Sequence, residues 1–222
     1  MKKFKIFNPK KWKKVEKTQK GIHFTSEVNK YLENILIYFL MSTPVTPDMI
    51  TILTDILAFF AVYLALNNLI GWFLVIAFIV TILDGTDGKL ARVKGIEGKI
   101  GKIEHSFDFL YEQAWYATIV WTIFRTTNSL YFLGMGLVFI VLDGYVRHIY
   151  NIAWLSTGKS LKENKKWRWF FKVDARRNVH VWYWIVFYVL GYFQYAIFLN
   201  LLHTAITAFI YTYISFKQKS KR

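Results

Sequence analysis

Six apolar runs follow one another along the chain, separated by short polar segments. Several approach the roughly 20 apolar residues that an α-helix needs to cross a bilayer. The pattern therefore predicts an all-α integral membrane protein with six transmembrane helices. The expected spans are residues 47–66, 70–92, 103–124, 130–152, 179–190 and 195–215. The fifth is short, so its helix is expected to begin within residues 174–178 or to lean on its neighbours.

Three segments outside these spans are candidates for the membrane surface. Between residues 24 and 41 the apolar positions recur with helical period, which predicts a helix on or partly in the membrane. Residues 1–20 are rich in lysine and fit either an interfacial amphipathic helix or a disordered basic tail. Residues 151–172 place tryptophans among lysines and are expected to form a further interfacial element.

Composition agrees with a membrane protein. The chain is 55% apolar and 19% aromatic, more than an ordinary soluble domain contains. It has no cysteine, which excludes disulfides and thiolate metal sites. Its basic start lacks the apolar stretch of a cleaved signal peptide. The expected organisation is a basic interfacial segment (1–25), a six-span domain (26–216) and a basic tail (217–222).

The net charge of +15 is compatible with nucleic acid or with an anionic membrane surface, and its distribution decides between them. Of the 29 Lys and Arg residues, 28 lie before the first span, in alternate connections (89–102 and 147–177) or after the last span. The positive-inside rule places these segments and both termini in the cytoplasm. Topology and anionic lipid therefore explain the charge, and no nucleic-acid partner is expected.

Charged residues cluster at the inner end of the second span, where burial in a bilayer is costly. Asp84 and Asp87 lie three residues apart and share a helix face, which Gly88, Ala91 and Arg92 continue. The two small residues allow a ligand or another backbone to approach. Arg92 carries a planar guanidinium suited to phosphate.

The third span opens with a second acidic face, because Glu104, Asp108 and Glu112 are each four residues apart. Two facing helices with acidic residues would build a site of oxygen ligands for Mg²⁺ or Mn²⁺, which commonly bind together with substrate phosphates. The alternative is that these are helix-end charges in the headgroup region.

The stretch Asp84–Arg92 resembles the signature of the CDP-alcohol phosphotransferases, membrane enzymes that build phospholipid head groups. That signature is Asp-x-x-Asp-Gly-x-x-Ala-Arg, then about eight residues, then Gly-x-x-x-Asp-x-x-x-Asp. The first part matches fully, and Gly101 stands at the expected distance. Upstream, Thr46-Pro-Asp48-Met-Ile-Thr51 resembles the family's Thr-Pro-Asn-x-x-Thr. The resemblance covers about residues 26–215 and implies the six-span fold.

The second half of the signature departs from the pattern. Strict spacing from Gly101 places His105 and Phe109 where the family has its third and fourth aspartates. A one-residue deletion would instead place Glu104 and Asp108 there, which restores two carboxylates, and we favour this register. His105 as a ligand is the alternative.

The resemblance implies a reaction and a set of residues. The family moves a substituted phosphoryl group from a CDP-alcohol to a second alcohol and releases CMP. It implies Mg²⁺ or Mn²⁺, expected as a pair, at Asp84, Asp87, Glu104 and Asp108. Asp108 is the expected general base. The residues expected to bind the CDP-alcohol are Gly88, Ala91, Arg92 and Thr51.

The sequence says less about which alcohol is the acceptor. Arg147, Arg176 and Arg177 stand at the inner ends of the fourth and fifth spans, where they would hold a phosphorylated polyol or serve only as boundary anchors. Without a phosphate contact, a small alcohol such as serine would be the acceptor. Asp55 and Asp143 lie deeper in their spans, where they pair with each other, support a polar network or line a cavity.

Two other functions remain open at this stage. In the first, the chain would be an inactive homologue that binds CDP-alcohol. In the second, it would be a transporter that uses its carboxylates for cations or protons. The resemblance further implies a homodimer. The cell membrane is the expected location, with the active site at the cytoplasmic face.

Overall fold

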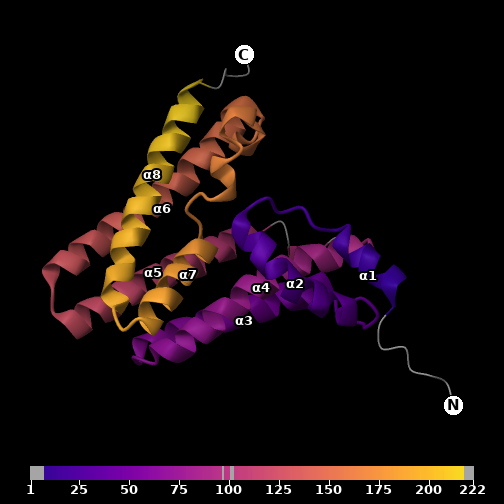
Figure 1. Cartoon of the computed structure of the whole chain (residues 1–222), viewed down its shortest axis with the longest axis horizontal. Coiled ribbons are helices and arrows are strands. Elements are labelled where there is room, and N and C mark those ends of the chain that lie inside the picture. The colour runs from indigo at the N-terminus through magenta and orange to yellow at the C-terminus, as the bar shows by residue number, and fades with distance from the viewer. Residues whose placement is uncertain (1–7, 97, 101–102, 218–222) are drawn as a thin grey trace. The chain divides into compact units, whose positions relative to one another are not determined.

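The computed structural model describes residues 8–96, 98–100 and 103–217, without the side chain of Glu104. This described part is helical and contains no β-strand. Figure 1 shows the longer elements, which are α1 (Pro9–Glu16), α2 (Phe24–Leu40), α3 (Pro47–Leu66), α4 (Ile70–Lys94), α5 (Glu104–Thr127), α6 (Leu130–Thr157), α7 (Arg177–Val189) and α8 (Ala196–Lys217). Short 3₁₀ turns are η2 (Leu161–Glu163), η3 (Lys165–Trp167), η4 (Phe170–Lys172) and η5 (Phe193–Tyr195).

A helix lies at each of the six expected spans, and the predicted helix at 24–41 is α2. Four helical segments of the described chain are long and apolar enough to cross a membrane: α3, α4, α6 and Phe193–Lys217, which includes α8. The chain is therefore a multi-pass membrane protein. The count of six spans stays a prediction, because α5 begins with several charged residues and α7 has only 13 residues.

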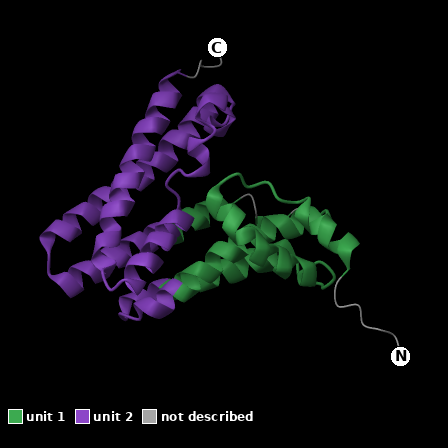
Figure 2. Ribbon diagram, viewed as in Figure 1, with its two compact units in different colours: residues 1–61, 75–111 green, residues 62–74, 112–222 purple. Residues whose placement is uncertain are grey.

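The chain forms two compact units, coloured separately in Figure 2. Unit 1 consists of residues 1–61 and 75–111, and unit 2 of residues 62–74 and 112–222. Unit 1 thus contains the whole stretch Asp84–Arg92 together with the first two turns of α5. Unit 2 contains the three arginines predicted to bind the acceptor.

The N-terminal helices of unit 1 begin at identifiable caps. The Asn8 side chain accepts hydrogen bonds from the backbone N–H groups of Lys10 and Lys11, and Pro9 takes the first helical position, where its missing N–H costs nothing. His23 caps α2 by accepting from the N–H of Thr25. Within residues 1–20, residues 9–16 therefore form a helix, and its place at the membrane surface stays a prediction.

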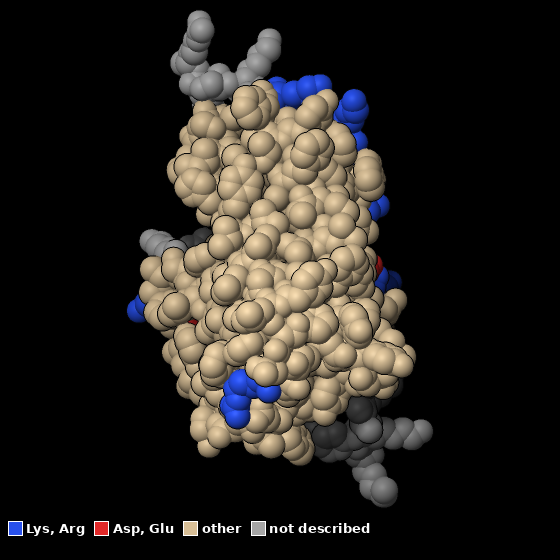
Figure 3. Space-filling view, turned by 90° about the vertical axis from the view of Figure 1, so that its left-hand side faces the viewer, with Lys and Arg blue, Asp and Glu red and all other residues tan. Residues whose placement is uncertain are grey.

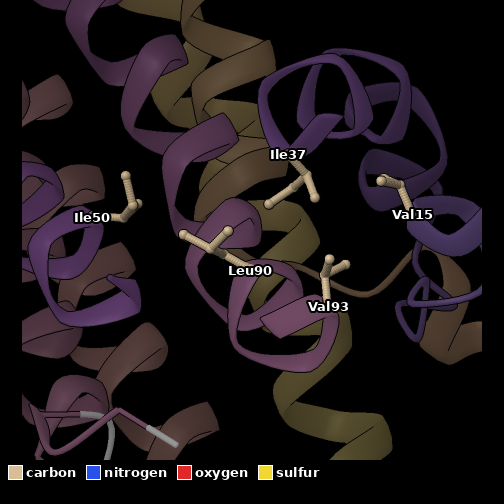
Figure 4. Close-up of a cluster of buried hydrophobic side chains, with 5 residues drawn as sticks. All are labelled: Val15, Ile37, Ile50, Leu90 and Val93. Atoms are coloured by element: carbon tan, nitrogen blue, oxygen red, sulfur yellow. The ribbon is translucent and has the colours of Figure 1, made fainter. Parts of the chain in front are cut away.

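A small apolar core joins α1, α2, α3 and α4 in unit 1. It contains Val15, Ile37, Ile50, Leu90 and Val93, all at least nine-tenths buried (Figure 4). Leu90 and Val93 belong to the last turns of α4, so this packing fixes the end of the helix that carries the acidic cluster. Burial of such side chains contributes roughly 1.5–3 kcal/mol each.

Unit 2 has an aromatic core. Phe73 packs edge-on against Trp115, and Tyr116 packs against Phe139 and Trp184, all fully buried. The buried tryptophans of α5 and α7 therefore serve packing. On the outside, α6 and α8 pack side by side and expose apolar residues. The face seen in Figure 3 carries few charged side chains, with Lys and Arg at its edges and in its lower part, which suits a lipid-facing surface.

Candidate functional site

Asp87 is held in a defined orientation near the end of α4. It is 5% exposed, and its Oδ2 accepts a hydrogen bond of 2.7 Å from the hydroxyl of Thr51 on α3. Its Oδ1 accepts from the backbone N–H of Gly88. Both of these donors are neutral groups, and they fix the orientation of the carboxylate. Thr51, expected to bind the CDP-alcohol, therefore acts here on a carboxylate of the signature.

Arg92 ends the same segment and reaches back to the N-terminal region. Its Nε donates to the backbone oxygen of Thr18 at 3.0 Å, and the side chain is exposed. A Cβ added at Gly88 would come within 3.3 Å of Arg92 Nη1, so glycine leaves room for this guanidinium. Asp84 and Ala91 are partly buried on the same helix.

Lys89 lies in this segment but is withdrawn from solvent by an ion pair that the sequence did not reveal. Its Nζ lies 2.6 Å from Glu33 Oε2 and donates to Asn34 Oδ1 at 3.0 Å, both on α2. A Cβ at Gly85 would meet the Glu33 carboxylate, which explains the glycine. Burial raises the pKa of the Glu33 carboxyl, and Lys89 offsets part of this. The only sign of this ion pair in the sequence was a glutamate among the periodic apolar residues of α2.

Asp108 is the acidic residue that the structure describes at the start of α5. It is 8% exposed, and its Oδ1 accepts from the Tyr111 hydroxyl at 3.1 Å. His105 Nδ1 lies 3.4 Å from the other oxygen, although most of the His105 side chain is exposed. Phe109 is a partly exposed apolar residue. Asp108 thus has the environment of an oriented carboxylate.

Gly101, which anchors the strict spacing, and the side chain of Glu104 lie outside the described residues. The choice between Glu104 and His105 therefore stays a prediction.

The predicted metal ligands are only partly brought together in the described part of the chain. Among the described side chains, no group of three or more His, Asp or Glu residues is close enough to hold a metal ion. Asp84, Asp87 and Asp108 alone therefore do not make a complete site here. The donor chemistry nevertheless fits a hard cation, because these ligands offer only oxygen and Asp87 is oriented by neutral groups.

Glu112, one residue after the end of unit 1, has a different environment. In unit 2 this buried carboxylate is bound by Arg147, and its Oε1 lies 3.2 Å from Arg177 Nη1. The cluster therefore brings together two of the three predicted acceptor arginines. Since two guanidinium groups share one carboxylate, these three residues carry one excess positive charge.

A second polar layer lies one helical turn away in unit 2. The Gln113 amide donates to Asp143 Oδ2 at 2.8 Å, and His180 Nε2 lies 3.9 Å from Asp143 Oδ1. Of the alternatives for Asp143, this supports membership of a polar network.

Arg176, the third arginine, is fixed by Asp174. Its Nε and Nη2 donate to the two carboxylate oxygens at 2.6 and 2.9 Å, and Tyr211 donates to the same fully buried carboxylate. Lys162 is exposed to solvent, yet partial desolvation by the surrounding protein lowers the pKa of its ammonium group to about 8, and the positive charge of Arg176 adds to this. Lys162 is a further cation that the sequence reasoning did not single out.

The arrangement in unit 1 can orient carboxylates for a cation, and that in unit 2 can present positive charge to an anion. A family model described as CDP-alcohol phosphatidyltransferase matches residues 44–213 of the chain. The match contains every predicted site residue. A comparison with curated proteins found no match.

Proposed function

Because the chain belongs to the CDP-alcohol phosphatidyltransferase family, we propose that it transfers a substituted phosphoryl group from a CDP-linked lipid to the hydroxyl of a second alcohol. The family acts in lipid synthesis by phosphotransfer from CDP-alcohols. The products are CMP and a phosphodiester. The observation that carries the proposal is the intact stretch Asp84–Arg92, in which Thr51 and the Gly88 backbone orient Asp87.

The carboxylates of Asp84, Asp87, Glu104 and Asp108 would hold Mg²⁺ or Mn²⁺. When bound, such ions offset the charge of the diphosphate and stabilise the leaving CMP. Thr51 keeps one oxygen of Asp87 engaged and leaves its negative charge intact. Arg92 adds a guanidinium for a phosphate oxygen, and Gly88 and Ala91 leave space beside it.

Asp108 is proposed to accept the proton of the attacking hydroxyl. The hydrogen bond from Tyr111 supports this role, because it fixes the orientation of the carboxylate while one oxygen faces the exposed His105. A carboxylate bound by a guanidinium would be a weaker base. Glu112 is in that situation and is therefore not proposed as the base.

We propose a phosphorylated polyol as acceptor. The excess positive charge of Arg147 and Arg177 on Glu112, together with Arg176 and Lys162, supports binding of a phosphate. If the three arginines are only boundary anchors, the KM for the acceptor should not depend on these residues.

We further propose six spans, with α5 and α7 added to the four apolar candidates, and both termini in the cytoplasm. The proposed location is the cell membrane, with the active site at the cytoplasmic face and a homodimeric assembly. The alternation of basic connections supports the topology.

The test is CMP release by purified protein in detergent with Mg²⁺ or Mn²⁺ and a panel of CDP-alcohols and acceptors. Release with one pair, lost in Asp108→Asn, is the expected result. Measurable CDP-alcohol binding without release would instead identify a binding homologue. Cation flux in liposomes without release would identify a transporter.

A further inference from the structure

Asp48, in the first turn of α3, binds a segment about fifty residues further along the chain. Its Oδ2 accepts a hydrogen bond from the backbone N–H of Lys99 at 3.1 Å, and its Oδ1 accepts from the N–H of Ile100 at 3.3 Å. Both carboxylate oxygens are therefore used by two successive backbone donors. Hydrogen bonds from N–H groups to an ionised carboxylate are roughly twice as strong as neutral ones.

The bound segment is the link between the two halves of the signature. It begins after Lys94, the last residue of α4, and it leads to Glu104, the first residue of α5. Gly95 takes a left-handed conformation (φ +69°), which terminates α4 and turns the chain. None of the described residues of this link (95, 96, 98–100 and 103) is buried, so contacts with other segments must set its path.

The chain preceding α3 holds the same link at a second point. The Lys94 ammonium donates to the backbone oxygens of Thr43 and Val45, at 2.6 Å each. Residues 43–48 thus bind the link at its beginning through Lys94 and close to its end through Asp48. These two contacts restrict the path of the chain between α4 and α5.

We propose that Asp48 is a positioning residue for the transfer reaction. By binding Lys99 and Ile100 it sets where α5 begins, and hence where Asp108 lies relative to Asp84 and Asp87. The catalytic part of this inference rests on the proposed function. It also accounts for aspartate at this position, since asparagine has one acceptor oxygen and its amide NH₂ would face the second N–H.

A spin label tests the tether without relying on activity. The chain has no cysteine, so Lys99→Cys gives a single labelling site that is exposed and keeps its backbone N–H. In Asp48→Ala we expect the label at residue 99 to become more mobile by electron paramagnetic resonance. A label at Lys13→Cys on α1, also exposed, should not change. Unchanged mobility at residue 99 would overturn the inference.

Kinetics tests the positioning role. Asp48→Ala should lower kcat by about 10–100-fold, because small displacements of reacting groups have effects of this size. The Mn²⁺ concentration for half-maximal activity should rise, while the KM for the CDP-alcohol changes little. Asp48→Asn should show the same changes to a lesser degree, and it serves if the alanine variant does not fold.

A double-variant comparison isolates the contact. Lys99→Pro removes one of the two backbone donors, and Lys99→Ala is the matched control that keeps it. The Asp48→Ala/Lys99→Pro pair should be little worse than Asp48→Ala alone. Full additivity would overturn the inference, as would a mobile label with normal kcat and Mn²⁺ dependence. A wild-type protein without any transfer activity would overturn the proposed function instead. The mobility of the label would still show whether Asp48 holds the α4–α5 link.

Discussion

Two buried carboxylates in each unit have contrasting partners. In unit 1, Asp87 and Asp108 accept hydrogen bonds from hydroxyl groups of Thr51 and Tyr111. In unit 2, Glu112 and Asp174 are bound by arginines. A neutral donor orients a carboxylate and leaves its charge for a cation, whereas a guanidinium compensates that charge. Carboxylates of the same chemistry are thus oriented by hydroxyl groups in one unit, which suits the reactive role proposed for them, and paired with guanidinium groups in the other.

Arg92 lies close enough to Asp87 for their charges to interact, but its hydrogen bond is directed elsewhere. Its charge interacts with Asp87, but its Nε–H is directed to the backbone oxygen of Thr18. Lys89, also in the signature, is taken up by Glu33. Each cation of this segment therefore has an identified partner outside the two signature aspartates.

The largest expected effect is on catalysis by unit 1. Asp108→Asn removes the proposed base and should lower kcat for CMP release by about 10²–10⁴-fold. Thermal stability in detergent should change little, because the amide oxygen still accepts from Tyr111. Phe109→Leu is the neighbouring control and should retain activity. A fully active Asp108→Asn protein would remove the distinction between the units.

Glu112→Gln should act on stability. It leaves two guanidinium groups without their shared charge, and loss of a buried partner costs about 3 kcal/mol or more. Thermal unfolding in detergent measures the change. Adding Arg177→Met should recover part of the lost stability, since it removes one unmatched charge. If the single variant is as stable as wild type, the ion cluster does not organise unit 2.

Thr51→Val tests one hydrogen bond of unit 1, the one that Thr51 donates to Asp87. Losing a group that orients a ligand carboxylate typically costs about 10–100-fold in metal affinity or activity, so we expect kcat to fall by that factor. Thr51→Ser should restore most of it. Thr54→Val is the matched control, because the buried Thr54 hydroxyl donates only to the backbone oxygen of Ile50 among its described hydrogen bonds. Equal losses at both positions would argue for packing alone.

The smallest effect is a pH dependence of the acceptor site. Lys162 has a pKa lowered to about 8, so it is protonated below that pH and neutral above it. The KM for a phosphorylated acceptor should therefore rise between pH 7 and 9, by about fivefold at most because the Lys162 charge is exposed to solvent. In Lys162→Met the rise attributable to this group should disappear. A pH profile identical in both proteins would exclude Lys162 from the site.

Helix positions were accessible from the sequence because apolar periodicity is a local property. The helices at 47–66 and 130–152 were expected and found, the second extended to Thr157. The acidic helix faces could be predicted for the same reason, since Asp84 and Asp87 belong to one helix. The packing of Val15 against α4 was not legible, because lysines dominate its surroundings in the sequence.

Contacts between helices were the part that the sequence did not reveal. The hydrogen bond that Thr51 donates to Asp87 and those that Asp48 accepts from the α4–α5 link join residues far apart in the chain. A motif places these residues at the start of α3 but does not state what they touch. Asp48, which looked like a mismatch to the family pattern, has two hydrogen bonds that suit a carboxylate better than an amide.

The most direct test of the account is Mn²⁺ binding, followed by loss of the free-ion signal in electron paramagnetic resonance. The account predicts that wild-type protein binds Mn²⁺ and that Asp87→Asn weakens binding by about 10–100-fold. It also predicts that the Glu112→Gln/Arg177→Met pair binds like wild type. Equal weakening in both variants, or wild-type affinity in Asp87→Asn, would contradict the assignment of the cation to the carboxylates of unit 1.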